Sequence, residues 1–140
     1  MTLYLDTSAV VKLYADEQGS AETRRAVAEA DPIASSLLAY PETRAALARK
    51  YQTREIDGAA FARSKAQFEI DWRGFVIMPV DVLTVRNAGE LAEQFNLRAY
   101  DAIHLATANS LSRETVFAVR FMCFDVALNR AASSLGLAVG

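Results

Sequence analysis

The sequence predicts an α/β domain whose largely parallel sheet is covered by helices on both faces. Short apolar segments alternate with longer segments of helical periodicity along the whole chain, which is the pattern of consecutive strand–helix units. The length of 140 residues suits one domain. We expect a single domain over 1–140, because the chain shows no repeat, low-complexity tract or linker.

Composition narrows the class of protein. Hydrophobic residues make up 52% of the chain and charged residues 23%, as in folded globular proteins. No apolar run approaches the roughly 20 residues that cross a bilayer, and no signal peptide is recognisable. The one cysteine, Cys123, can build neither a disulfide framework nor a thiolate metal site. We therefore expect a cytoplasmic protein without membrane contact, while a net charge of −2 leaves nucleic-acid binding open.

The first predicted strand, 3–5, ends in a carboxylate. Asp6 follows the strand directly, and the hydroxyl residues Thr7 and Ser8 come next, before the helical pattern of 9–14. In open α/β sheets, ligands bind outside the carboxyl ends of the strands. Asp6 is therefore a candidate site residue.

Prolines place the next boundaries. A helix over 21–30 ends before Pro32, because a proline disfavours the helical conformation in the preceding residue. The strand 33–35 follows. Pro41 is tolerated only in the first turn of the next helix, which starts near residue 40 and places Glu42 in its opening turn. The remaining predicted elements are helices over 59–72, 81–95 and 100–108, strands over 75–80, 116–124 and 137–139, and a helix through Leu128, Ala131 and Ala132.

Four acidic residues are predicted at one edge of this sheet. Asp6 and Asp125 follow strands, whereas Glu42 and Asp101 open helices after loops. The carboxyl ends of parallel strands and the starts of the following helices lie on the same side. Converging carboxylates raise one another's pKa unless a cation lies among them. Mg²⁺ or Mn²⁺ suits these oxygen ligands, so the pattern predicts a metal-dependent phosphodiester hydrolase.

Each of these residues also has a simpler interpretation. Asp6 or Thr7 can cap the helix that follows, and any of the acids can be a solvated surface charge. Ser8 can hydrogen-bond Asp6 or a metal-bound water. His104, one turn after Asp101, is expected to be a buried residue with one or two hydrogen bonds. A further set of basic residues forms either a phosphate-facing patch or the solvated face of a helix: Arg44, Arg49, Lys50 and Arg54.

Four parts of the chain carry a resemblance to a known family: 5–14, 41–47, 100–108, and Phe124-Asp125 followed by Leu128, Ala131 and Ala132. They resemble the PIN domain family, and within it the stand-alone ribonuclease toxins of the VapC type. The resemblance implies a PIN-like three-layer α/β/α fold with a five-stranded parallel sheet of order 3-2-1-4-5. It also implies a Mg²⁺- or Mn²⁺-dependent endoribonuclease that forms a homodimer and is held inactive by a small antitoxin protein.

The resemblance also assigns residues. The family's metal-binding acids, which are also its catalytic residues, fall on Asp6, Glu42, Asp101 and Asp125, and its catalytic hydroxyl falls on Ser8. Many relatives place the last acid in a Thr-x-Asp context, whereas this chain has Cys-Phe-Asp, so direct contact between Asp125 and the metal stays open. RNA and an antitoxin are the expected partners, although the sequence names neither the RNA nor the antitoxin.

Other assignments remain to be weighed. A non-catalytic PIN-like module that binds RNA or protein would keep the fold and lose the metal, and the presence of all four acids argues against it. A haloacid-dehalogenase phosphatase needs a second aspartate two positions after the first, where this chain has Ser8. A receiver domain needs paired acids after its first strand, where Asp6 stands alone.

Overall fold

Five parallel strands form one sheet in the computed structural model, which describes residues 1–140. The strands are β1 (Thr2–Leu5), β2 (Ile33–Ser36), β3 (Val76–Met78), β4 (Val119–Met122) and β5 (Ala138–Val139), in the order β3-β2-β1-β4-β5. The helices are α1 (Thr7–Lys12), α2 (Ser20–Glu29), α3 (Ala39–Gln52), α4 (Gly58–Trp72), α5 (Val82–Phe95), α6 (Ala99–Glu114) and α7 (Val126–Ser134). The predicted fold class and strand order are confirmed.

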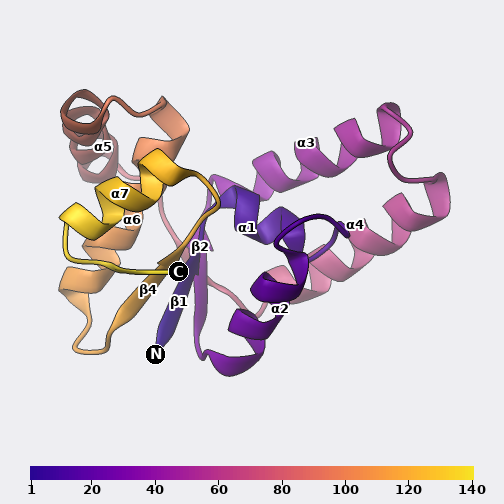
Figure 1. Ribbon diagram of the computed structural model, residues 1–140, viewed down its shortest axis with the longest axis horizontal. Coiled ribbons are helices and arrows are strands. Elements are labelled where there is room, and N and C mark those ends of the chain that lie inside the picture. The colour runs from indigo at the N-terminus through magenta and orange to yellow at the C-terminus, as the bar shows by residue number, and fades with distance from the viewer.

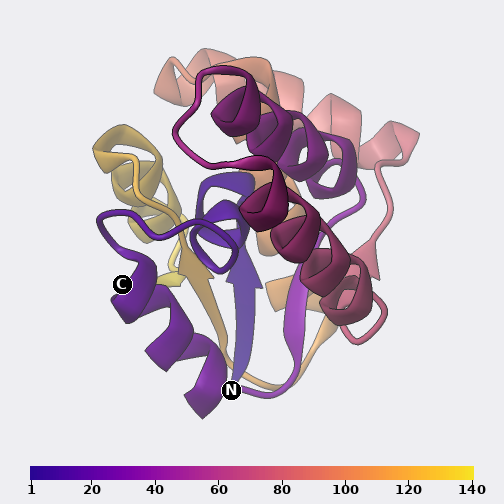
Figure 2. The ribbon, with the colours of Figure 1, turned by 90° about the vertical axis from the view of Figure 1, so that its right-hand side faces the viewer.

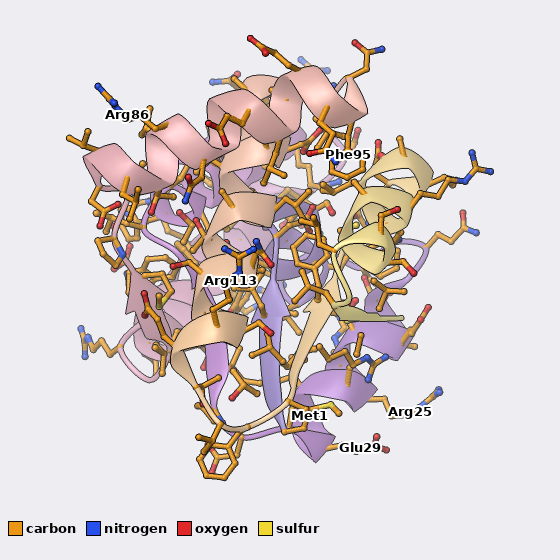
Figure 3. All side chains as sticks on the ribbon, turned by 90° about the vertical axis from the view of Figure 1, so that its left-hand side faces the viewer. Met1, Arg25, Glu29, Arg86, Phe95 and Arg113 are labelled. Atoms are coloured by element: carbon orange, nitrogen blue, oxygen red, sulfur yellow. The ribbon has the colours of Figure 1, made fainter.

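Helices cover both faces of the sheet, as Figure 1 shows, with α1 to α4 on one side and α5 to α7 on the other. Successive residues of a strand point to opposite faces. In β1, the side chains of Leu3 and Leu5 therefore join the buried cluster under α1 to α4, whereas Tyr4 joins the cluster under α5 to α7. The second cluster is seen from its own side in Figure 3, where Arg86 and Arg113 project outward and Phe95 packs inward.

The central strand β1 pairs with β2 and with β4, so the three strands end side by side. Leu3 lies opposite Ile33, and Leu5 lies opposite Met122. Figure 2 shows these strands running in one direction, with α1 beginning at the end of β1. The loops that follow these strands and the first turns of the next helices consequently gather at one edge.

Some predicted boundaries were wrong. The strand expected over 116–124 is reduced to Val119–Met122, because Val116 and Phe117 are 95% and 70% exposed and lie before the sheet. Helix α1 begins at Thr7 rather than at residue 9, since the Asp6 carboxylate caps the Ala9 N–H. Helix α6 continues through the polar residues to Glu114. None of the helices is both long and apolar enough to span a membrane.

Candidate active site

A cavity of about 650 Å³ lies at the carboxyl edge of the sheet and is lined by all the predicted site residues. The acids reach it from four places in the chain: the end of β1, the first turn of α3, the first turn of α6, and the residue that caps α7. They are Asp6, Glu42, Asp101 and Asp125, with Ser8 beside the first. The fold therefore places the four acids around one space, as the strand–helix pattern predicts.

Asp6 is both a helix cap and a lining residue of the cavity. Its Oδ1 accepts hydrogen bonds from the Ala9 N–H at 2.9 Å and from the Ser8 hydroxyl at 2.7 Å, while Oδ2 receives none. The residue is 4% exposed. Burial raises the pKa of Asp6, and the Asp101 charge adds to this, although both hydrogen bonds and His104 oppose it. The cap and the site interpretation are thus compatible, because they use different oxygens.

Glu42 is held by a buried hydrogen-bond network. Its Oε1 accepts a hydrogen bond from the Thr7 hydroxyl and lies 3.2 Å from His104 Nε2. Thr7 Oγ1 lies 2.9 Å from the same nitrogen, and the Tyr4 hydroxyl lies 2.9 Å from His104 Nδ1. Burial of Glu42 acts to raise its pKa, but the hydrogen bonds from His104 and Thr7 outweigh it and lower the pKa. Glu42 is therefore ionised, with Oε2 free of protein donors.

Asp101 and Asp125 have fewer partners. Asp101 Oδ2 meets only Arg98 Nε, at 3.4 Å. Burial raises the pKa of Asp101 and the Asp125 charge adds to it, while Arg98 opposes both. Asp125 Oδ1 caps α7 by accepting a hydrogen bond from the Leu128 N–H at 2.8 Å. Each of these two carboxylates also keeps one oxygen free of hydrogen bonds from the chain.

The carboxylate oxygens in the cavity that accept no hydrogen bond are chemically suited to a hard divalent cation. The four unengaged carboxylate oxygens are the ligand type that Mg²⁺ and Mn²⁺ prefer. Softer ligands are excluded: both nitrogens of His104 are already hydrogen-bonded, and burial raises the pKa of the Cys123 thiol to about 12. However, no three of the His, Cys, Asp and Glu side chains are grouped closely enough to hold a metal ion. The donors share a cavity without forming a closed ligand cluster.

Basic side chains line the same cavity as the acids. Glu17 holds Lys12 at 3.0 Å and Lys50 at 2.7 Å through its two oxygens, whereas Arg49 forms no ion pair. The basic patch predicted on α3 is therefore divided. Arg49 and Lys50 face the cavity, but Arg44 lies outside it and is paired with Glu69 at 2.7 Å.

Gly19 allows the side chains of Lys12 and Phe124 to pack closely beside the cavity. Its φ of +93° lies in the left-handed region, and a Cβ at this position would come within 2.6 Å of Phe124 and 2.8 Å of Lys12. The Lys12 ammonium lies 4.5 Å from the centre of the Phe124 ring. The turn before α2 is thus fitted around the residue that precedes Asp125.

Sequence reasoning underrated Thr7 and His104. The expectation of a buried His104 with one or two hydrogen bonds is correct for its burial, at 1% exposed, but its partners include a site acid. One signal was present in the chain: residues 101 and 104 share a helix face, so His104 lies on the side of α6 that carries Asp101. No pattern near Tyr4 in the sequence indicated its contact with His104, which lies a hundred positions further along the chain.

Comparison with known proteins gives consistent matches. The PIN domain family matches residues 3–119. Ribonuclease VapC46 from Mycobacterium tuberculosis is 37% identical over 137 residues, covering 98% of this chain and 95% of the relative. Ribonuclease VapC49 from the same organism is 36% identical over 106 residues, covering 76% of this chain and 74% of the relative. A toxin–antitoxin complex from Klebsiella pneumoniae contains a chain of the same fold, with a TM-score of 0.61, 22% identity and coverage of 88% and 86%.

Proposed function

Because this chain belongs to the PIN domain family, we propose that it is a metal-dependent endoribonuclease and the toxin of a toxin–antitoxin pair. The observation that carries the proposal is the single cavity lined by four carboxylates, each with one oxygen free of protein donors. The relatives named as ribonucleases support hydrolysis of RNA as the reaction.

The proposed ligands of Mg²⁺ or Mn²⁺ are the four acids themselves. A divalent cation among them would stabilise charge on a phosphate and acidify a bound water. Hydrogen bonds within the chain orient these carboxylates: the Ala9 N–H of α1 and Ser8 orient Asp6, while Thr7 and His104 orient Glu42. The raised pKa values of Asp6 and Asp101 support this assignment, because a cation relieves the repulsion and desolvation that raise them.

RNA as the substrate is supported by the charges around the acids. Lys12, Arg49 and Lys50 line the cavity and present cations to a phosphate backbone that the four acids alone would repel. Arg49 is exposed and has no acidic partner, so its guanidinium is available to phosphate oxygens. We propose that the substrate strand lies along this basic side of the cavity.

A second groove suits an antitoxin segment. Seven of its eleven lining residues are hydrophobic, and the groove runs between α2 and α4, with Val27, Ile33, Ile70 and Phe75 among them. An amphipathic helix that lays its apolar face into a groove is a common recognition mode. The toxin–antitoxin complex from Klebsiella pneumoniae, which contains a chain of this fold, supports an antitoxin as the partner.

A homodimer is the proposed assembly. Helix α5 begins with three exposed apolar side chains, Val82, Leu83 and Val85, which are 74%, 66% and 49% exposed. Exposed Leu37 adds a further apolar side chain next to the end of β3, where its N–H bonds the Met78 carbonyl. Exposed apolar side chains gathered at the start of one helix support a protein contact there.

The test is cleavage of a total-RNA pool by the purified chain, freed of any antitoxin, with Mg²⁺, with Mn²⁺ and with EDTA. We expect discrete products in either metal, none in EDTA, and none from Asp101→Asn. The matched control is Asp16→Asn, because the Asp16 side chain is 95% exposed and lies outside the cavity. Equal cleavage by Asp101→Asn and the control would contradict the assignment of the acids.

A non-catalytic PIN-like module that binds RNA or protein is the second candidate. The observation in its favour is that no three potential ligands are grouped closely enough to hold a metal. The two functions differ in three measurements: RNA binding, RNA cleavage and calorimetry with Mn²⁺. A non-catalytic module would bind RNA equally well with and without EDTA, would leave it uncut, and would give no heat on titration with Mn²⁺.

A further inference from the structure

The hydrogen bonds around Glu42 form one connected path through four elements. It runs from Tyr4 in β1 to His104 in α6, then to Thr7 at the start of α1, and ends on Glu42 in α3. Tyr4 and His104 are 0% and 1% exposed, so water cannot substitute for their partners. Each contact in the path is therefore made by a protein group.

Counting donors and acceptors fixes the direction of the bonds at Thr7 and Glu42. A carboxylate can only accept, so the Thr7 hydroxyl uses its one hydrogen on Glu42 Oε1. The contact between Thr7 Oγ1 and His104 Nε2 must then use a hydrogen on Nε2. The same Nε2 lies 3.2 Å from Glu42 Oε1, so this hydrogen is shared between Thr7 and Glu42. In a neutral ring, Nδ1 is left as an acceptor.

Tyr4 supplies the hydrogen that Nδ1 needs. The Tyr4 hydroxyl is fully buried and lies 2.9 Å from Nδ1. Its O–H can therefore donate to that nitrogen. All three donors of the path are used, and both ring nitrogens have a partner.

We propose that Tyr4, His104 and Thr7 form a positioning relay that places a hydrogen on His104 Nε2 and orients the Glu42 carboxylate. Two hydrogen bonds then converge on Oε1, and Oε2 is the atom left for a ligand in the cavity. None of the three residues needs to touch a substrate or a cation for this role. Their importance for metal binding rests on the proposed function, because Glu42 is one of its four acids.

The tautomer is tested directly by NMR. The chain contains one histidine, so the ring signals of the ¹⁵N-labelled protein need no assignment. At mildly alkaline pH and without metal, we expect a long-range ¹H–¹⁵N spectrum in which Nε2 carries a hydrogen. A ring with a hydrogen on Nδ1 and none on Nε2, or averaging between the two tautomers, would overturn the relay.

The orienting role is tested by titrating Mn²⁺ alone into three variants at threonine positions. Thr7→Val keeps the shape of the side chain and removes the hydroxyl, whereas Thr7→Ser keeps the hydroxyl. We expect Mn²⁺ affinity to fall about 10–100-fold in Thr7→Val, the range for loss of an outer partner of a metal ligand, and to recover in Thr7→Ser. Thr43→Val is the matched control, because the buried Thr43 hydroxyl next to Glu42 has no hydrogen-bond partner.

The outcomes separate the relay from the proposed function. Wild-type affinity in Thr7→Val, or an equal loss in Thr43→Val, would contradict the orienting role while leaving the metal site intact. Absence of Mn²⁺ binding in the wild-type protein would contradict the proposed function, and the NMR spectrum would then decide the relay. If Thr7→Val fails to fold, affinity at or near the wild-type value in Thr7→Ser together with a hydrogen on Nε2 supports the relay, and a ring without that hydrogen overturns it.

Discussion

The two halves of the cavity differ in how firmly they hold their acids. Asp6 and Glu42, the inner pair, each accept hydrogen bonds on one oxygen from two groups of the chain. Asp101 and Asp125, the outer pair, have one long contact with an exposed arginine and one backbone cap. The inner pair is therefore preorganised before any ligand arrives. The outer pair is held loosely, which agrees with the lack of a closed cluster of three potential ligands.

The largest expected effect comes from replacing Asp6 of the inner pair, and the comparison is with replacing Asp125 of the outer pair. Asp6→Asn should abolish Mn²⁺ binding in the absence of RNA and lower cleavage by more than about a hundredfold, beyond the loss caused by an outer partner. Asp125→Asn should lower cleavage by about tenfold and retain Mn²⁺ binding, because Asp6, Glu42 and Asp101 remain. Calorimetry with Mn²⁺ and single-turnover cleavage measure both. The reverse order of the two variants would show that the outer pair forms the primary site.

Tyr4→Phe tests how strongly the inner pair is supported. The substitution leaves a buried acceptor, His104 Nδ1, without a donor, which costs about 1–3 kcal/mol in the free energy of unfolding. Tyr51→Phe is the control, because the Tyr51 side chain is exposed and its hydroxyl makes no hydrogen bond in the structure. Urea unfolding of both variants gives the difference. If Tyr4→Phe is as stable as Tyr51→Phe, the inner network contributes nothing to the fold.

The pH dependence of stability tests the cost of burying Asp6. Because burial raises the pKa of Asp6 in the folded state, that state binds the proton more tightly than the unfolded chain does. The free energy of unfolding therefore falls as pH rises from the ordinary value of 3.8 through the folded pKa. Asp6→Asn removes the buried charge and keeps an effective helix cap.

The expected result for Asp6→Asn without metal at neutral pH is a gain in the free energy of unfolding, because the variant has no charge to bury at this position. The gain should vanish in acid, where Asp6 is protonated in both states. Mn²⁺ at a hundred times its Kd should reverse the order, because it adds about 2.7 kcal/mol to the wild-type protein alone. Thermal unfolding at several pH values measures this, and a less stable variant at neutral pH would contradict the cost assigned to burial.

The positions of the acids can be predicted from the sequence, whereas the contacts that support the inner pair cannot. The positions of the four acids follow from local rules: Asp6 ends a strand, Pro41 sets the first turn that contains Glu42, and parallel strands bring their carboxyl ends together. Capping by Asp6 is equally local. These features depend on neighbours in sequence and on the parallel arrangement of the strands, which the strand–helix alternation predicts, so a single sequence is enough to predict them.

The support of the inner pair depends on contacts between distant segments. Thr7 and Ser8 are adjacent hydroxyl residues, yet Ser8 turns back to Asp6 while Thr7 reaches Glu42, 35 positions away. The basic patch on α3 is divided in the same way, because helical rotation directs Arg49 to the cavity and Arg44 to Glu69. Residue type and spacing leave these choices open, and the packing of α1 and α3 decides them.

The smallest effect is expected at the outer pair, from Arg98→Gln. Arg98 is the only side chain that contacts the Asp101 carboxylate, but its own side chain is 68% exposed and the contact is long. Exposed ion pairs contribute little because solvent screens them. The variant should unfold at the same urea concentration as the wild-type protein, while the pKa of Asp101, followed by ¹³C NMR of its carboxyl carbon, should rise further without the opposing charge. Arg44→Gln, which breaks an ion pair outside the cavity, should leave that pKa unchanged. A loss of stability in Arg98→Gln as large as that in Tyr4→Phe would mean that the outer acids are as firmly held as the inner ones.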